Sequence, residues 1–149
     1  KEGKIGSVRA FVFYPHTGSD HTPDSPVPDS LDWNMWCGPA PLRPYNKALH
    51  PKGFRNFLDY ATGMVGDWGV HWFDQILWWS EDKHPKNIYS IGKQIFENSI
   101  YDAPDQQTAV FEFEEFTVNW EHRRYAGNES EKHSIGVYFH GTEGIFHMG

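Results

Sequence analysis

Two side chains that can exchange a proton near neutral pH, Asp67 and His71, lie four residues apart in the stretch 62–79. On an α-helix this spacing places them one turn apart on the same face, and Asp74 continues the line. A carboxylate beside an imidazole can orient the ring and favour its protonated form. The pair is therefore a candidate for acid–base catalysis, although the same pattern also occurs as a surface hydrogen bond or a helix cap.

The segment around this pair predicts a helix that is reached through a tight turn. Glycines stand at positions 63, 66 and 69, and apolar residues then recur every three or four positions. We expect a helix over Asp67–Trp79 that ends near 80–83, before Pro85. A shorter helix predicted over 52–60 would present Arg55 just ahead of the turn, either to hold a substrate hydroxyl or carboxylate or to pair with Asp59.

Alternating apolar residues predict strands over 4–14, 87–97, 107–113, 116–123, 134–140 and 145–148. The third and fourth are separated by Glu114-Glu115, and the last two by Gly141–Gly144, so each pair is expected to form a hairpin. Tight connections favour an α+β fold with a predominantly antiparallel sheet, one face of which is covered by the 67–79 helix.

A proline-rich loop is predicted over 15–51, which holds eight of the ten prolines and so excludes a long helix or a central strand. Its second half has aromatic residues to bury and is expected to be ordered, whereas 16–29 is expected to be less so. Trp36 and Tyr45 are candidate substrate contacts, with packing that anchors the loop as the alternative for the tryptophans.

Composition narrows the possible classes of protein. A chain of 149 residues suits one domain, and a net charge of −7 with scattered basic residues argues against nucleic acid as a partner. No apolar run approaches the roughly 20 residues of a membrane span, so no membrane partner is expected. The N-terminus has no signal-peptide core but lies within a predicted strand, which leaves a cytoplasmic or an exported location open. The single Cys37 excludes an internal disulfide.

Several motifs together resemble the C-terminal domain of the Gfo/Idh/MocA oxidoreductases, named for glucose–fructose oxidoreductase and inositol dehydrogenase. They are Trp33–Pro41, Phe54-Arg55, the ordered set Gly63, Gly66, Asp67, Gly69, His71 and Asp74, and the segments Gly3–Val8 and Gly141–Gly144. The resemblance implies an open-faced sheet with helices on one side, as in the C-terminal domain of dihydrodipicolinate reductase. It also implies that Asp67 and His71 contact the substrate, with His71 accepting the proton of the oxidised hydroxyl.

Dinucleotide binding requires a strand, a G-x-G-x-x-G turn and a helix, and this pattern does not occur in the sequence. Residues 63–69 read G-x-x-G-x-x-G, and Asp67 within them would repel a phosphate. The Glu-Lys-Pro element that the family uses is also absent from the sequence. We therefore expect residues 1–149 to be the substrate-binding and oligomerisation part of a larger enzyme, inactive alone, with NAD or NADP bound mainly by a Rossmann domain missing from this chain.

The expected partners are a sugar or polyol substrate, the protein's own N-terminal Rossmann domain, and other copies of the chain through the open face of the sheet. A non-catalytic carbohydrate-binding or assembly module, with tryptophans stacking on sugar, is the main alternative. A metal-dependent hydrolase using Asp67, His71 and Asp74 is a weaker one. Nine histidines occur without H-x-x-x-H or H-E-x-x-H spacing, so no metal site is expected.

Overall fold

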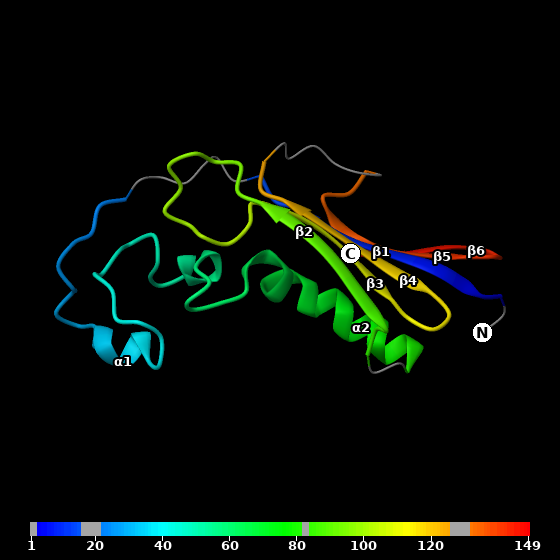
Figure 1. Cartoon of the computed structure of the whole chain (residues 1–149), viewed down its shortest axis with the longest axis horizontal. Coiled ribbons are helices and arrows are strands. Elements are labelled where there is room, and N and C mark those ends of the chain that lie inside the picture. Colours follow the sequence, from blue (N-terminus) through cyan, green and yellow to red (C-terminus); the bar gives the residue numbers. More distant parts are fainter. Residues whose placement is uncertain (1–2, 16–21, 82–83, 126–131) are drawn as a thin grey trace.

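The computed structural model describes residues 3–15, 22–81, 84–125 and 132–149. Within them, six strands form one sheet in the order β2-β3-β4-β1-β5-β6, with a helix against one face and an arm at one end (Figure 1). The strands are β1 (Ile5–Phe13), β2 (Asn87–Lys93), β3 (Gln106–Glu112), β4 (Thr117–Arg123), β5 (Ile135–Gly141) and β6 (Gly144–Met148). Neighbours are antiparallel except β1 and β4, which are parallel. The predicted α+β fold and both hairpins are confirmed.

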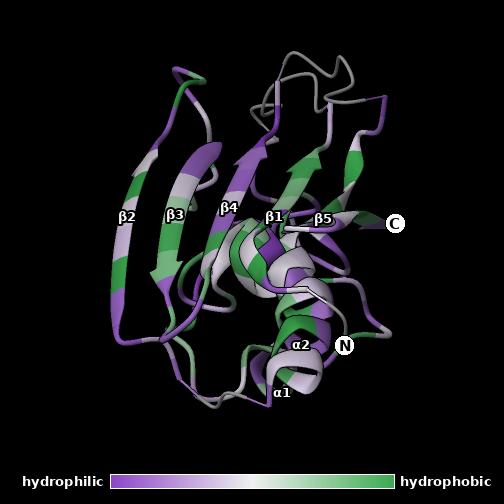
Figure 2. Cartoon of the chain, turned by 90° about the vertical axis from the view of Figure 1, so that its right-hand side faces the viewer, coloured by the Kyte–Doolittle hydropathy of each residue, from purple (hydrophilic) through white to green (hydrophobic). Residues whose placement is uncertain are grey.

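The period of two in β1 explains the main hydrophobic core. Val8, Ala10 and Val12 point to one face, where α2 (Val70–Ser80) contributes Trp72 and Ile76. Neighbouring strands add Val118, Trp120, Val137 and Phe139 to the same buried cluster. Burying a large apolar side chain contributes about 1.5–3 kcal/mol, so this layer holds the helix to the sheet. Figure 2 shows α2 lying in front of β4, β1 and β5. The sequence predicted that this helix would cover one face of the sheet.

The central helix begins with a wider turn than the sequence predicted. Residues Val65–Gly69 form a π-helical turn, here η2, and regular α-helix follows only from Val70. Gly63 has a φ of +67°, and a Cβ at Gly66 would lie 1.8 Å from the Thr62 Oγ1 atom. These glycines therefore allow a backbone path that residues with side chains would resist, and π turns of this kind are frequent at functional sites.

The helix predicted over 52–60 is wrong. Only a short 3₁₀ turn, η1 (Gly53–Asn56), forms, and Phe57 returns to extended backbone. The Asn56 carbonyl accepts from the backbone N–H groups of Asp102 and Ala103, at 3.2 and 3.1 Å, instead of from a helical neighbour. Tertiary hydrogen bonds therefore replace the helical ones. Strand β2 similarly ends at Lys93, earlier than predicted.

The arm between β1 and η1 has its own aromatic core. It contains a five-residue helix that was not predicted, α1 (Trp33–Cys37), capped by the Asp32 carboxylate, which accepts from Met35 N at 2.9 Å. A second buried cluster joins Trp33, Cys37, Tyr45, Leu49 and Phe57. The predicted order of the second half of the 15–51 loop is confirmed, whereas residues 16–21, within the segment expected to be less ordered, lie outside the described residues.

The sheet face opposite α2 carries apolar side chains and, within the described residues, no helix (Figure 1). Phe11 and Phe13 stack on each other here with ring centroids 5.2 Å apart, and Tyr138 stacks on Phe11. Both phenylalanines are buried, whereas Tyr89 and Ile91 of β2 are 62% and 66% exposed. This open face is the surface at which the sequence predicts association between copies.

Candidate active site

A cleft of about 380 Å³ lies where η1, η2 and the ends of β1 and β4 meet. Its lining consists of Tyr14, Lys52, Gly53, Arg55, Asn56, Gly63, Met64, Asp67, Trp68, Tyr101 and Arg124. A larger cavity of about 570 Å³ lies at the other end of β1 and holds none of the predicted site residues. The chemistry-bearing side chains therefore mark the smaller cleft as the candidate site.

Asp67 enters the cleft from the π turn and is held there by Arg55. The Arg55 Nε atom donates to Asp67 Oδ1 at 2.7 Å, and Arg55 Nη1 donates to the Lys52 carbonyl at 3.1 Å. The side chains of Arg55 and Asp67 are 43% and 29% exposed, so the pair contributes at most about 1 kcal/mol to stability. Its main effect is to fix the carboxylate. Arg55 thus pairs across 12 residues with Asp67, and not with Asp59.

His71 lies in the first turn of α2 with an exposed side chain. Its ring makes an edge contact with Trp68, at 5.9 Å between ring centroids. The side chains of His71 and Asp67, both within the described residues, share no hydrogen bond. The π turn changes the register between positions 67 and 71 relative to a continuous α-helix. His71 therefore stands beside Trp68, which lines the cleft, and not in the lining itself. Asp74 is exposed further along α2.

Trp36 and Tyr45 lie apart from Asp67, in the aromatic core of the arm. Tyr45 is buried edge-on against Trp33, at 5.2 Å between centroids. Trp36 stacks face to face on Trp33 at 4.7 Å and also contacts Tyr60, and it lines a separate cavity of about 540 Å³ in the arm. Burial and the hydrogen bond to Cys37 raise the pKa of Tyr60 to about 12. The structure does not bring Trp36 and Tyr45 into the cleft with Asp67 and Arg55.

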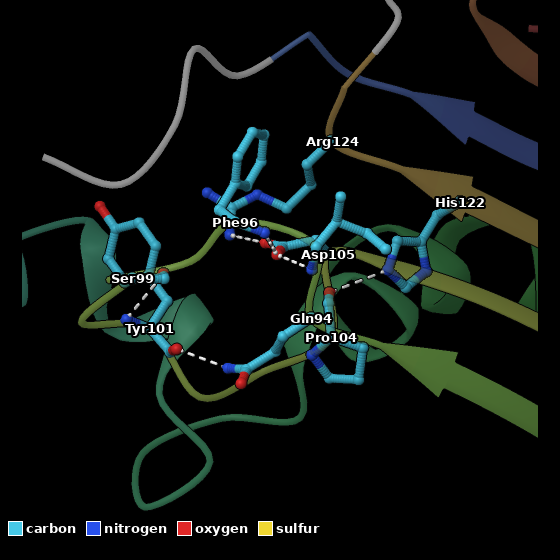
Figure 3. A network of polar contacts seen from close by, with 9 residues as sticks. Gln94, Phe96, Ser99, Tyr101, Pro104, Asp105, His122 and Arg124 are labelled. Atoms are coloured by element: carbon cyan, nitrogen blue, oxygen red, sulfur yellow. Dashed lines mark hydrogen bonds and ion pairs between the residues drawn. The ribbon is translucent and has the colours of Figure 1, made fainter.

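Arg124, at the end of β4, is a lining residue that the sequence analysis missed. It is 4% exposed and pairs with Asp105, whose Oδ1 atom is 3.5 Å from Arg124 Nη1. The other oxygen of Asp105 accepts from the backbone N–H groups of Ile95 and Phe96 (Figure 3). The guanidinium also lies 4.9 Å from the Tyr101 ring centroid. No local sequence pattern links residues 95, 101, 105 and 124, which only the fold brings together.

His122 lies beside this network and is neutral. Burial lowers its pKa to about 4, although its hydrogen bond to the Pro104 carbonyl acts in the opposite direction. The Trp120 Nε1 atom donates to His122 Nδ1 at 3.2 Å, so the ring proton is on Nε2, which donates to the Pro104 oxygen at 3.2 Å (Figure 3). A neutral, fully bonded imidazole that holds the Pro104 carbonyl, next to Asp105, has a structural role.

The described parts of the chain hold neither a cluster of metal ligands nor a glycine-lined phosphate cradle around η2. No three His, Cys, Asp or Glu side chains gather there, and Asp67, His71 and Asp74 do not form such a group. A Cβ at Gly66 or Gly69 would meet Thr62 or Phe73, so these glycines serve the packing of the helix itself. No helix among the described residues is long and apolar enough to span a bilayer.

Comparison with known proteins identifies the domain. A family profile described as "Oxidoreductase family, C-terminal alpha/beta domain", of the Gfo/Idh/MocA group, matches residues 5–100. No curated protein matches. Among solved structures, the Bacillus subtilis protein yvaA, assigned as an oxidoreductase, is similar with a TM-score of 0.55 and 13% identity over 94% of this chain. The match covers 29% of yvaA, so this chain spans less than a third of that protein. The chain belongs to the Gfo/Idh/MocA oxidoreductase family and carries its C-terminal α/β domain.

Proposed function

We propose that this chain is the substrate-binding part of an NAD(P)-dependent oxidoreductase that moves a hydride between a nicotinamide and a sugar or polyol. Family membership supports the reaction class, and the cleft beside η2 supports the location. The cleft offers a carboxylate, cationic donors and aromatic walls, which suit a ligand with several hydroxyl groups. The cofactor, NAD or NADP, would be bound mainly by a Rossmann domain that is not part of this chain.

One observation carries the proposal: Arg55 uses only one oxygen of Asp67. The bond goes to Oδ1, and Oδ2 accepts from no protein group within the described residues. Because an ionised carboxylate is a strong acceptor, the free oxygen can take the hydrogen bond of a substrate hydroxyl. Arg55 therefore orients Asp67, and Asp67 orients the substrate.

His71 is the proposed proton acceptor. Oxidising an alcohol transfers the electron pair of the C–H bond as hydride and releases the hydroxyl proton, leaving a carbonyl. A bound nicotinamide supplies the hydride acceptor. An imidazole nitrogen can accept the proton, and His71 lies beside Trp68, which lines the cleft.

The test is a nicotinamide absorbance assay on the full-length protein that carries this chain, with a panel of sugars and polyols, with and without a chelator. We expect sugar-dependent reduction of the nicotinamide that the chelator does not change. Activity that a chelator abolishes would favour the metal-dependent hydrolase instead. Absence of turnover with every sugar, in a folded and cofactor-loaded protein, would contradict the proposal.

A non-catalytic sugar-binding domain is the second candidate, because Asp67 is engaged by Arg55 and not by His71. That role predicts saturable sugar binding in calorimetry without any nicotinamide turnover. The same binding should then be unchanged by His71→Ala. The oxidoreductase proposal also predicts that His71→Ala keeps sugar binding, but it predicts nicotinamide turnover in the wild type that this variant loses.

We also propose that copies of the chain associate through the open face defined above. Phe11 and Phe13 stack there but are buried, and the guanidinium of Arg123 lies 3.6 Å from the Phe13 ring centroid, so the apolar surface open to a partner comes from β2. Strand β2 extends the surface with Tyr89 and Ile91. Extended apolar surface of this kind is common at protein interfaces.

A further inference from the structure

The guanidinium of Arg124 has more hydrogen-bond donors than protein partners. It carries five N–H donors, and one nitrogen, Nη1, faces the Asp105 carboxylate at 3.5 Å. Asp105 is a shared acceptor, because its other oxygen takes the backbone N–H groups of Ile95 and Phe96. No further acceptor for this guanidinium is present among the described residues. Arg124 nevertheless has a side chain only 5% exposed and lines the cleft.

The charges around the cleft do not balance. Lys52, Arg55 and Arg124 contribute three cations to the lining, against the single carboxylate of Asp67. Arg55 pairs with Asp67, and Arg124 pairs with Asp105, so one net positive charge, that of Lys52, remains at the lining. Lys52 is exposed and forms no ion pair with a described residue. This local excess of positive charge occurs in a chain whose net charge is −7, so it does not reflect a generally basic protein.

The two cationic sides of the cleft are fixed relative to each other. Asp102 N and Ala103 N donate to the Asn56 carbonyl, and the Asp102 carboxylate accepts from Leu58 N at 2.6 Å. These bonds tie the loop carrying Tyr101 to η1, which carries Arg55 and follows Lys52. Tyr101 in turn lies against the Arg124 guanidinium, 4.9 Å from its ring centroid. The site is therefore organised before a ligand arrives, which lowers the entropic cost of binding.

We infer that Arg124 and Lys52 form a subsite for an anionic group of the substrate, so that the cleft prefers an acidic sugar, a sugar carboxylate or phosphate ester, over a neutral one. The inference rests on the proposed function, which takes the ligand to be a sugar or polyol. A planar guanidinium with unused donors matches the two oxygens of a carboxylate or phosphate, and the Lys52 ammonium adds a second charge. A volume of about 380 Å³ lies within the usual range of small-molecule sites.

Calorimetry on the full-length protein tests the subsite without requiring turnover. The probes are D-gluconate, D-glucuronate and glucose 6-phosphate, compared with D-glucitol, D-glucose and inorganic phosphate. We expect at least one acidic sugar to bind ten times more tightly than its neutral counterpart, with affinity that falls as salt is added. Comparing the affinity for glucose 6-phosphate with the affinities for the two sugar carboxylates shows which anionic group the cleft prefers. The affinity for inorganic phosphate alone shows whether the anion is recognised without the sugar.

Two variants and two matched controls locate the binding. Arg124→Lys keeps the positive charge but loses the planar guanidinium. It should lower the affinity for the acidic sugar about tenfold and leave the affinity for D-glucitol unchanged. Lys52→Gln changes an exposed side chain, so it should lower the affinity for the acidic sugar several-fold without affecting folding. The controls are Arg123→Lys, the adjacent residue, which faces the opposite side of the sheet, and Lys47→Gln, an exposed lysine outside the cleft. Neither control should change affinity.

Equal affinity for acidic and neutral sugars, equal losses in the control variants, or no saturable binding of any acidic sugar would overturn the subsite. Its failure differs from failure of the proposed function. If neutral polyols are turned over with the same KM as acidic sugars, the oxidoreductase proposal stands and the subsite is wrong. If acidic sugars bind in the cleft but no nicotinamide is reduced, the subsite stands and the proposed reaction is wrong.

Discussion

Replacing Asp67 by Asn separates a structural role of this residue from a role in substrate handling. The change keeps the shape of the side chain and an oxygen facing Arg55, but removes the charge. Because the Arg55–Asp67 pair is 43% and 29% exposed, its loss should cost at most about 1 kcal/mol of folding free energy. For a domain of 149 residues that corresponds to a fall in Tm of roughly 2–4 °C.

The expected loss of activity is larger. A hydrogen bond from a substrate hydroxyl to a charged acceptor is worth about 1.5–3 kcal/mol, which corresponds to a fall of roughly 10- to 150-fold in kcat/KM. The assay pairs nicotinamide absorbance with thermal unfolding on the full-length protein. Asp74→Asn is the matched control, since Asp74 is exposed on the same helix and outside the cleft, and should change neither quantity.

Two outcomes would refute this reasoning. A kcat/KM within twofold of the wild type would show that the Asp67 carboxylate does not contact the reacting substrate. A fall in Tm of more than about 8 °C, with kcat unchanged per folded molecule, would show that the ion pair is mainly structural.

In the full-length enzyme, His71→Ala should lower kcat by about 10²- to 10⁴-fold with little change in Tm, because an exposed side chain is lost; unchanged turnover in a kinetic assay would contradict its role. Burial lowers the pKa of His122 from an ordinary 6.5 to about 4. As the pH falls through this range, the unfolded chain binds a proton at this histidine before the folded chain does. The free energy of unfolding should therefore fall by up to about 3 kcal/mol between pH 6.5 and pH 4. Urea unfolding at pH 7 and pH 4.5 measures this fall, which His122→Gln should reduce. Sedimentation should show a dimer or larger species that Tyr89→Lys, a change on the exposed β2, disrupts. A monomer at high micromolar concentration would contradict the interface. Isothermal titration of the 149-residue chain should detect no sub-millimolar binding of NAD or NADP, and saturable binding would contradict the assignment to the substrate-binding part.

The strands were predictable because their signal is local. In β1 and β4, alternation of Val8, Ala10 and Val12 and of Val118 and Trp120 reflects one buried face, and each hairpin follows from two adjacent runs. The parallel pairing of β1 with β4 was not predictable in this way, since it joins residues more than 100 positions apart. Helix 52–60 failed for a related reason: its backbone groups bond to Asp102 and Ala103, which propensity cannot show.

The site was predictable only in part. Asp67 stood out because of its spacing from His71, and Arg55 because of its position ahead of the glycines, yet their pairing with each other depends on the path of the π turn. No local sequence pattern indicated that Arg124 lines the cleft, because its contacts Tyr101 and Asp105 come from a distant loop. Trp36 was a candidate sugar contact by residue type, but it stacks on Trp33 in the arm and lies outside the cleft that holds Asp67.

The placement of β1 between β4 and β5 has a consequence for the order in which the chain acquires its structure. Strand β1 is the first strand in the sequence, and its partners begin at Thr117 and Ile135. During synthesis from the N-terminus, its apolar residues are therefore exposed on the nascent chain while more than 100 further residues are added. Contacts at such separation slow folding, because a long loop must close before they form, and an unpaired apolar strand is prone to aggregate in the meantime. An inner strand of the finished sheet is thus the one whose apolar residues wait longest for their partners.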